Sequence, residues 1–315
     1  MSSDAEKVTR SGIWYEDGSV VLQAECKQFR VHWSVLAQES FFFHDLHQLP
    51  QKPDDPEQPC VDGCPLVELP DSVVDVEYLL KALYVPTFLG QTALPLPVIG
   101  ALIRLGRKYD FRDLLDFAVA RLTFENPTTL EAYDVLVSAD RGYTPTRIVD
   151  APGLLFDIIT LAQENNIMSV LPCAFYRLLQ SLDNLFDEVP RNDGTLVSLP
   201  FADLRRCVRA RDRLLKAQFQ TGYTAAWYRS WSPPDDCTTP NKCRKVRDSR
   251  VSCYLDSLHL LALSKFAPTA PGNKEFCPRC TESIELLNAT GRERAWNELP
   301  GFFDLPPWDE LKNNL

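Results

Sequence analysis

Two short runs decide the first fold expectation for this chain: Asp17-Gly18-Ser19-Val20-Val21-Leu22-Gln23-Ala24 and Phe29-Arg30-Val31-His32-Trp33-Ser34-Val35-Leu36. In the first run, Val20, Leu22 and Ala24 alternate with their neighbours, as the buried face of a strand does. Phe29 and Val31 alternate in the same way, and the polar residues 25–28 between the runs suit a turn. The second run continues into a helical pattern. The sequence therefore predicts a β-hairpin followed directly by a helix.

Beyond the hairpin, the spacing of apolar residues predicts one more strand and several helices, which are separated by loops. Residues 48–65 contain five prolines and little apolar character, which predicts an exposed loop. Leu66, Val67 and Leu69 form a third short strand, and a helical stripe follows from Val74. The uncharged residues 85–97 predict an apolar loop, after which helices are expected over 98–109 and 111–122.

The order and spacing of residues in this first third resemble a BTB/POZ domain. The resemblance covers residues 12–125, is closest to the BTB proteins of mushroom-forming (basidiomycete) fungi, and depends on Asp17, Phe29, His32, Leu36, Ser40 and Phe43. It implies an α+β BTB/POZ fold and a non-catalytic protein–protein interaction module. Such a module self-associates as a homodimer or recruits partners, in some members as a ubiquitin-ligase substrate adaptor that binds a cullin. The loop over 84–97 contains no acidic residue, whereas cullin-binding members carry a glutamate there.

The remaining chain predicts two further parts. Residues 126–231 show helical spacing, which predicts an all-helical extension that resembles the BACK-type extensions of BTB adaptors. The longest helix is expected over 204–231. Residues 232–315 form a cysteine-containing section, and Pro233-Pro234 near its start indicates a boundary. Its dense aromatic tail would be an aggregation hazard if exposed, so we expect it to pack on the helices.

Composition limits the classes of function. The chain has 315 residues, a net charge of −10 and 45% hydrophobic residues, which predicts a globular protein and argues against nucleic acid or anionic membrane as a partner. No apolar run reaches the roughly 18 residues needed to span a bilayer, and no secretory signal is evident. We therefore expect an intracellular location, cytoplasmic and/or nuclear. The ten cysteines are then reduced thiols or metal ligands.

Four cysteines in the last section form the strongest candidate for a functional site, a metal site. Cys237 and Cys243 are separated by five residues, and Cys277 and Cys280 form a CxxC motif around Pro278 and Arg279. A CxxC turn lets two thiolates approach one tetrahedral zinc ion at about 2.3 Å, and a second pair completes a closed structural site. Free thiols are the alternative. Cys253 or His259 could replace one ligand, but we expect both to be core residues of a helix over 249–264.

Catalytic motifs are absent from the sequence, which contains no GxGxxG, P-loop or GxSxG pattern. His32 is expected to be structural, and His44 and His47 to lie on a solvated helix face. Arginines over 205–213 fit the solvated face of a helix. Partner binding without catalysis is therefore the first hypothesis. A transcriptional or chromatin-associated regulator with a small structural zinc site is the alternative, and an enzyme is the least supported.

Overall fold

The computed structural model describes residues 7–49, 59–138, 142–180, 185–257, 259–267, 269–270 and 274–313. Its helices and strands confirm the mixed α+β class. The chain divides into two compact units. The first contains the described residues up to Glu125 together with Pro145–Asp150, and the second contains Asn126–Thr144 and Ala151–Asn313. The expected boundary at residues 231/232 stays a prediction.

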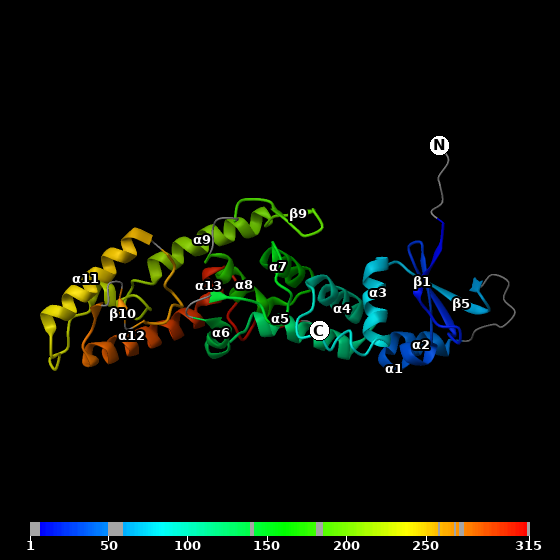
Figure 1. The fold of residues 1–315 in the computed structure, drawn as a ribbon, viewed down its shortest axis with the longest axis horizontal. Helices are drawn as coiled ribbons and strands as arrows, with labels where there is room; N and C mark the ends of the chain where they lie inside the picture. The colour runs from blue at the N-terminus through cyan, green and yellow to red at the C-terminus, as the bar shows by residue number, and fades with distance from the viewer. Residues whose placement is uncertain are drawn as a thin grey trace. The chain divides into compact units, whose positions relative to one another are not determined.

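A five-stranded sheet forms one side of the first unit (Figure 1). Its strand order is β1-β3-β2-β5-β4. The bounds are β1 Thr9–Trp14, β2 Val20–Ala24, β3 Lys27–Val31, β4 Cys60–Val61 and β5 Cys64–Leu69. β2 and β3 pair antiparallel, with Leu22 opposite Phe29, and β5 runs parallel to β2. The predicted hairpin and third strand are therefore confirmed.

The helices of the first unit are α1 Trp33–Glu39, α2 Phe41–Gln48, α3 Val73–Tyr84, α4 Leu96–Lys108 and α5 Arg112–Glu125. Ser40 separates the first two because its hydroxyl accepts the Phe43 N–H at 3.1 Å and so caps α2. The same hydroxyl donates to the carbonyl of Tyr109, at the end of α4. One buried serine thus links the α1–α2 corner to the core helix α4.

A short returning segment, Pro145–Asp150, belongs to the first unit although the chain leaves that unit after Glu125. Leu94 donates to the carbonyl of Arg147 at 3.1 Å, and Val149 donates back to Leu94 at 3.0 Å. Arg121 donates to the carbonyls of Thr92 and Arg147 at 2.8 and 3.0 Å. The segment is therefore held by main-chain pairing and by a buried guanidinium.

Glu125 is the carboxylate that fixes this segment. It is fully buried and accepts the N–H groups of Thr146 and Arg147 at 2.8 and 2.5 Å. We expect Glu125→Ala to destabilise the first unit by about 2 kcal/mol, because hydrogen bonds to a charged acceptor are lost. Hydrogen exchange of the amides over 145–150 measures this. Glu39→Ala, at an exposed glutamate, is the control, and unchanged protection in Glu125→Ala would contradict the role.

The second unit is built mainly from helices, with three two-residue strand pairs. The helices are α6 Leu130–Leu136, α7 Leu154–Glu164, the 3-10 turn η1 Met168–Val170, α8 Leu171–Leu178, α9 Phe201–Ala217, α10 Trp227–Ser230, α11 Pro240–Ser257, α12 Pro278–Asn297 and α13 Leu299–Phe302. The strands are β6 Val137–Ser138, β7 Gly142–Tyr143, β8 Val189–Pro190, β9 Leu196–Val197, β10 Thr269–Ala270 and β11 Lys274–Glu275.

Two expectations for this unit are wrong. The extension over 126–231 is not all-helical, since β6 pairs with β7 and β8 with β9. The second hairpin forms because Asp193 and Gly194 make its turn: Gly194 has a φ of 82°, and Asp193 accepts the Thr195 N–H. The chain over 204–231 is not one helix either. α9 ends at Ala217, and Gly222, with a φ of 83°, turns the chain before α10.

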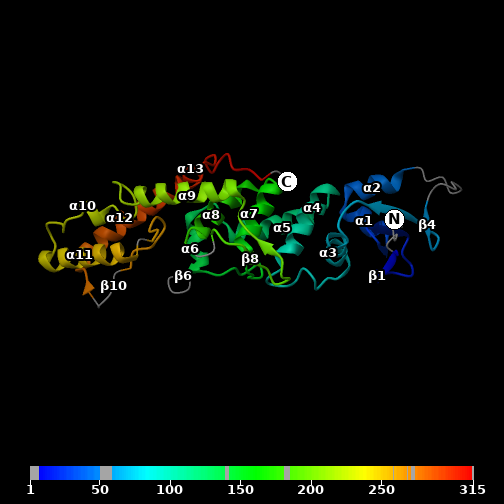
Figure 2. The ribbon, with the colours of Figure 1, turned by 90° about the horizontal axis from the view of Figure 1, so that it is seen from above.

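The aromatic tail lies against the helices of its own unit. Phe303 is fully buried and stacks on Phe175 of α8 at 5.4 Å. The Trp296 indole N–H donates to the carbonyl of Thr128 at 3.0 Å, and Trp308 stacks on Trp296. Both ribbon views place α13 beside α9 (Figures 1 and 2). Among the described residues, no helix combines the length and the apolar character that crossing a membrane requires.

Candidate metal centre

Three local structures position the four predicted cysteines. Cys237 lies in the loop before α11, and Cys243 lies in the first turn of that helix, where its N–H donates to the carbonyl of Thr239 at 2.9 Å. Cys277 is the N-cap residue of α12, and Cys280 follows in its first turn. Pro278 favours this helix start because its φ is already helical and it needs no N–H partner. The thiols of two helix starts therefore converge.

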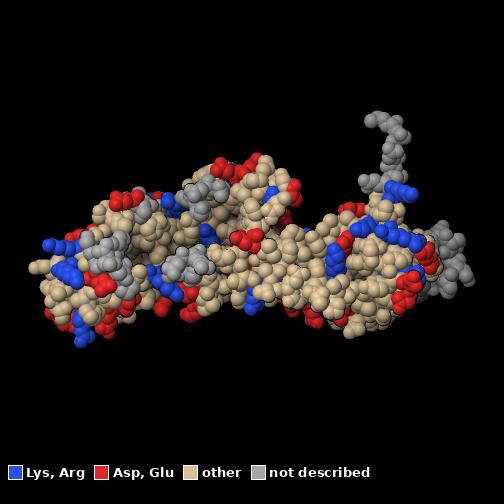
Figure 3. All heavy atoms as spheres, in the orientation of Figure 1, with Lys and Arg blue, Asp and Glu red and all other residues tan. Residues whose placement is uncertain are grey.

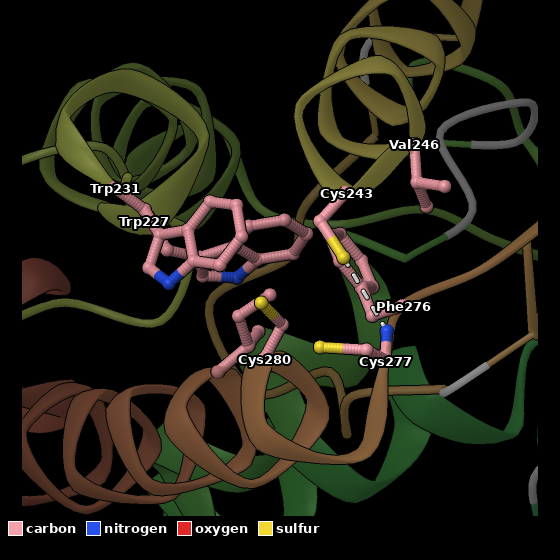
Figure 4. Packing of buried hydrophobic residues seen from close by; sticks show 8 residues of the cluster. Trp227, Trp231, Cys243, Val246, Phe276, Cys277 and Cys280 are labelled. Atoms are coloured by element: carbon pink, nitrogen blue, oxygen red, sulfur yellow. Dashed lines mark hydrogen bonds between the residues drawn. The ribbon is translucent and has the colours of Figure 1, made fainter. Parts of the chain in front are cut away.

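The four sulfur atoms all lie within 4.8 Å of one another. The Cys237 Sγ is 3.3 Å from the Cys280 Sγ and 3.6 Å from the Cys277 Sγ. Four sulfurs bound tetrahedrally at about 2.3 Å are about 3.8 Å apart, so the observed separations fit one zinc ion. The Cys277 N–H also donates to the Cys243 Sγ at 3.4 Å, shown as a dashed line in Figure 4. Such N–H···S contacts orient metal ligands.

An apolar shell surrounds the thiols. Figure 4 shows the indole rings of Trp227 and Trp231 beside Cys280, with Phe276 and Val246 beside Cys243. Cys243, Cys277 and Cys280 are buried, and Cys237 is partly buried. This shell keeps bulk water from the sulfurs and favours a closed site over an open one.

The electrostatics of the thiols also fit a cation. Burial alone would raise the pKa of Cys277, but the backbone N–H of Cys280 and the neighbouring thiols together lower it to about 6. Burial and the adjacent thiols instead raise the pKa of Cys280 above its ordinary value. Several thiolates so close together repel one another, so they cannot all ionise unless a cation compensates their charge.

The other candidate ligands lie elsewhere. Cys253 on α11 and His259 are both exposed, so the expectation that they are core residues is wrong. Neither joins the cluster. The expected helix over 249–264 is wrong in its bounds, since α11 covers Pro240–Ser257. Among the described residues, Cys237, Cys243, Cys277 and Cys280 form the one group of three or more candidate ligands that could hold a metal ion.

The other three histidines make local contacts in the first unit. The backbone N–H of His32 donates to the Tyr84 hydroxyl at 2.9 Å, and its ring contacts Asp17 at 3.2 Å. His47 stacks on Trp33 at 5.0 Å, while His44 contacts Gln48. These contacts fit the structural and surface roles expected for them.

Sequence reasoning missed a second group of polar residues, in the second unit. Arg292 on α12 forms a bidentate ion pair with Asp134 on α6, 158 positions earlier in the chain. Arg177, on α8, lies with its guanidinium 3.4 Å from the ring centroid of Tyr143. No local motif joins these residues, so only the fold reveals that they share one region.

The comparisons with known proteins give no relative. No protein-family model, no curated protein and no solved structure matches this chain.

Proposed function

We propose that this protein is a non-catalytic interaction protein whose first unit is a BTB/POZ-type module. The strand and helix order supports this: hairpin β2–β3, helices α1 and α2, β5 parallel to β2, and then α3, α4 and α5. Phe29, Leu36 and Phe43, three of the residues on which the resemblance depends, lie on β3, α1 and α2. The module binds a second copy of the chain or another protein, with a cullin as one candidate.

The observation that carries the binding proposal is a pair of exposed aromatic residues at the start of α2. The relative exposure of Phe41 is 61% and that of Phe42 is 42%, and Leu49, just beyond the helix, is also exposed. The Arg112 guanidinium lies 5.1 Å from the ring centroid of Phe41. Exposed aromatics beside an arginine match the composition of protein interfaces, in which a few such residues supply most of the affinity.

Replacing the two exposed aromatic residues by negatively charged ones is the direct test. We expect the double variant Phe41→Glu, Phe42→Glu to lower self-association or partner capture at least tenfold, because losing two aromatic anchors costs several kcal/mol. Sedimentation velocity measures self-association, and quantitative affinity purification from the native cells measures partner capture. Phe201→Glu, at an exposed phenylalanine on α9, is the matched control. Equal behaviour of the two variants would exclude the α2 patch as the interface.

The second part of the proposal is a structural zinc ion held by Cys237, Cys243, Cys277 and Cys280. Four protein thiolates would leave no coordination position for water or substrate, which is the arrangement of a structural site. The ion would tie the loop before α11 and the first turn of α11 to the first turn of α12.

Metal analysis tests the zinc site directly. We expect one zinc ion per chain in protein purified without chelator. After exchange into Co²⁺, we expect the intense visible absorption of a tetrahedral thiolate site, which Cys280→Ser should abolish. A metal-free protein in which all four thiols react freely with a thiol reagent would exclude the site.

A regulator of transcription or chromatin is the second candidate. The exposed Lys242, Arg244 and Lys245 favour it, because they lie on α11, the helix that also contains Cys243. On the visible face of this region, however, basic and acidic side chains are interspersed (Figure 3). This candidate requires DNA affinity that falls steeply with salt, and a salt-independent or absent affinity would remove it.

A further inference from the structure

A cavity of about 850 Å³ lies within the second unit. α6, α7, α8, α12 and the loop over 263–267 all contribute to its wall. Sites for small organic ligands typically measure about 300–1,000 Å³. This cavity is therefore large enough for a small organic molecule. None of the four clustered cysteines lines it.

The charged groups of the cavity wall are mainly positive. Among the described lining residues, three are cationic (Arg177, Lys265 and Arg292) and one is acidic (Asp134), which leaves a formal charge of +2. The relative exposure of Arg177 is only 5%, and that of Arg292 is 7%. Asp134 is shared, because Arg292 binds it in a bidentate pair and Lys265 approaches it at 3.3 Å. A positive cavity stands out in a chain whose net charge is −10.

The contacts that fix Arg177 include neutral groups. Its guanidinium faces the ring of Tyr143 at 3.4 Å and that of Tyr133 at 5.7 Å, and it donates to the amide oxygen of Asn126 at 3.2 Å. Stacking of this kind holds a guanidinium in a fixed position at the cavity wall.

Tyrosine rings supply the flat apolar part of the wall. Tyr133, Tyr143 and Tyr176 all line the cavity, together with Leu155, Leu263 and Phe266. Burial raises the pKa of Tyr176 to about 12, so its hydroxyl adds no negative charge near pH 7. Tyrosine faces beside a fixed guanidinium suit a ligand that has both a planar ring and an anionic group.

We propose that this cavity binds a small aromatic anion. The anionic group lies against the guanidinium of Arg177, and the ring of the ligand packs against the tyrosines. The ion pair and the bidentate hydrogen bonds that a carboxylate forms with arginine give the selectivity for the anion, because a neutral amide of the same shape has no charge and only one acceptor oxygen.

Matched pairs of probes test this inference. Each pair consists of an aromatic carboxylate and its neutral primary amide: benzoate with benzamide, 2-naphthoate with 2-naphthamide, and indole-3-acetate with indole-3-acetamide. Saturation-transfer NMR on the full chain detects binding, and titration gives the dissociation constants. We expect at least one acid to bind roughly tenfold or more tightly than its amide. Equal affinities in every pair, or no saturable binding of any acid, would overturn the proposal.

Two variants locate the binding in this cavity. Arg177→Gln should reduce the affinity for the acid to that for the amide. Because Arg177 is buried and this variant could misfold, Lys265→Glu gives an independent test at an exposed position of the wall. We expect Lys265→Glu to weaken acid binding at least fivefold, and Lys245→Glu, which makes the same charge change away from the cavity, to leave it unchanged. An equal loss in both lysine variants would show a general charge effect and refute a site in the cavity.

Discussion

Replacing Cys280 by serine is expected to release the proposed zinc ion and to unfold the region around α11 and the start of α12. Cys280 is fully buried, and its sulfur lies 3.3 Å from that of Cys237, so the ligand set cannot close without it. Binding free energies of structural zinc sites in small peptides are on the order of 10 kcal/mol, and that free energy is available only to the folded state. We therefore expect this region to lose a large part of its stability when the ligand set is broken.

Hydrogen exchange measured by mass spectrometry, with zinc content measured in parallel, checks this expectation. Peptides from α11 and the first half of α12 should exchange far faster in Cys280→Ser, whereas peptides from α4 and α5 should not change. Cys253→Ser is the matched control, because this cysteine is exposed on α11 and lies outside the cluster. Native protection in a metal-free Cys280→Ser protein would show that the cysteines are a packed thiol cluster.

The second large effect is expected from Gly291→Ala in the middle of α12. A Cβ at this position would lie 2.3 Å from the Thr224 backbone nitrogen and 2.4 Å from the Tyr223 carbonyl carbon. Real side chains do not approach backbone atoms so closely, so α12 must move away from the turn before α10. Alanine gains about 1 kcal/mol in helix propensity over glycine. Overpacking typically costs about 1–3 kcal/mol, and contact with backbone places this case at the upper end or beyond.

Thermal denaturation of the two glycine variants separates these contributions. We expect Gly291→Ala to lower the melting temperature of the second unit by several degrees, consistent with a net loss of about 2 kcal/mol or more. Gly301→Ala is the control, because no atom lies within 4 Å of the Cβ it would introduce. It should leave the melting temperature nearly unchanged. A Gly291→Ala protein as stable as the control would mean that α12 does not pack closely on residues 223–224.

Much of the first unit could be predicted because its patterns are local. Val20, Leu22 and Ala24 repeat with a period of two, and the stripe from Val76 to Leu80 has helical spacing, so strand and helix separate clearly. The returning segment 145–150 was not predictable. Its place depends on Arg121 and Glu125, and charged residues in a helical run ordinarily indicate a solvent-facing side.

The candidate metal centre was predictable from CxxC spacing, but the bounds of the helices that contain the cysteines were only partly predictable. α11 begins nine residues before the expected start. The sequence did not indicate this start, because the first turns of the helix are strongly polar and bury only Cys243 and Val246. A cysteine contributes little to a pattern of apolar residues, so the spacing of apolar residues did not indicate the buried side of this helix. The cavity was beyond sequence reasoning, since Asp134 and Arg292 meet only through tertiary packing.

The path of the chain around Pro145–Asp150 has a consequence for how this protein could be divided or recombined. The chain passes from one unit to the other after Glu125, after Thr144 and after Asp150. A gene fragment that stops after α5 would encode the first unit without the segment that fills the Arg121 and Glu125 sites. Transfer of an intact first unit to another protein would also have to include α6, because α6 lies between Glu125 and Pro145 in the sequence. Recombination at residue 125 is therefore expected to yield a defective domain.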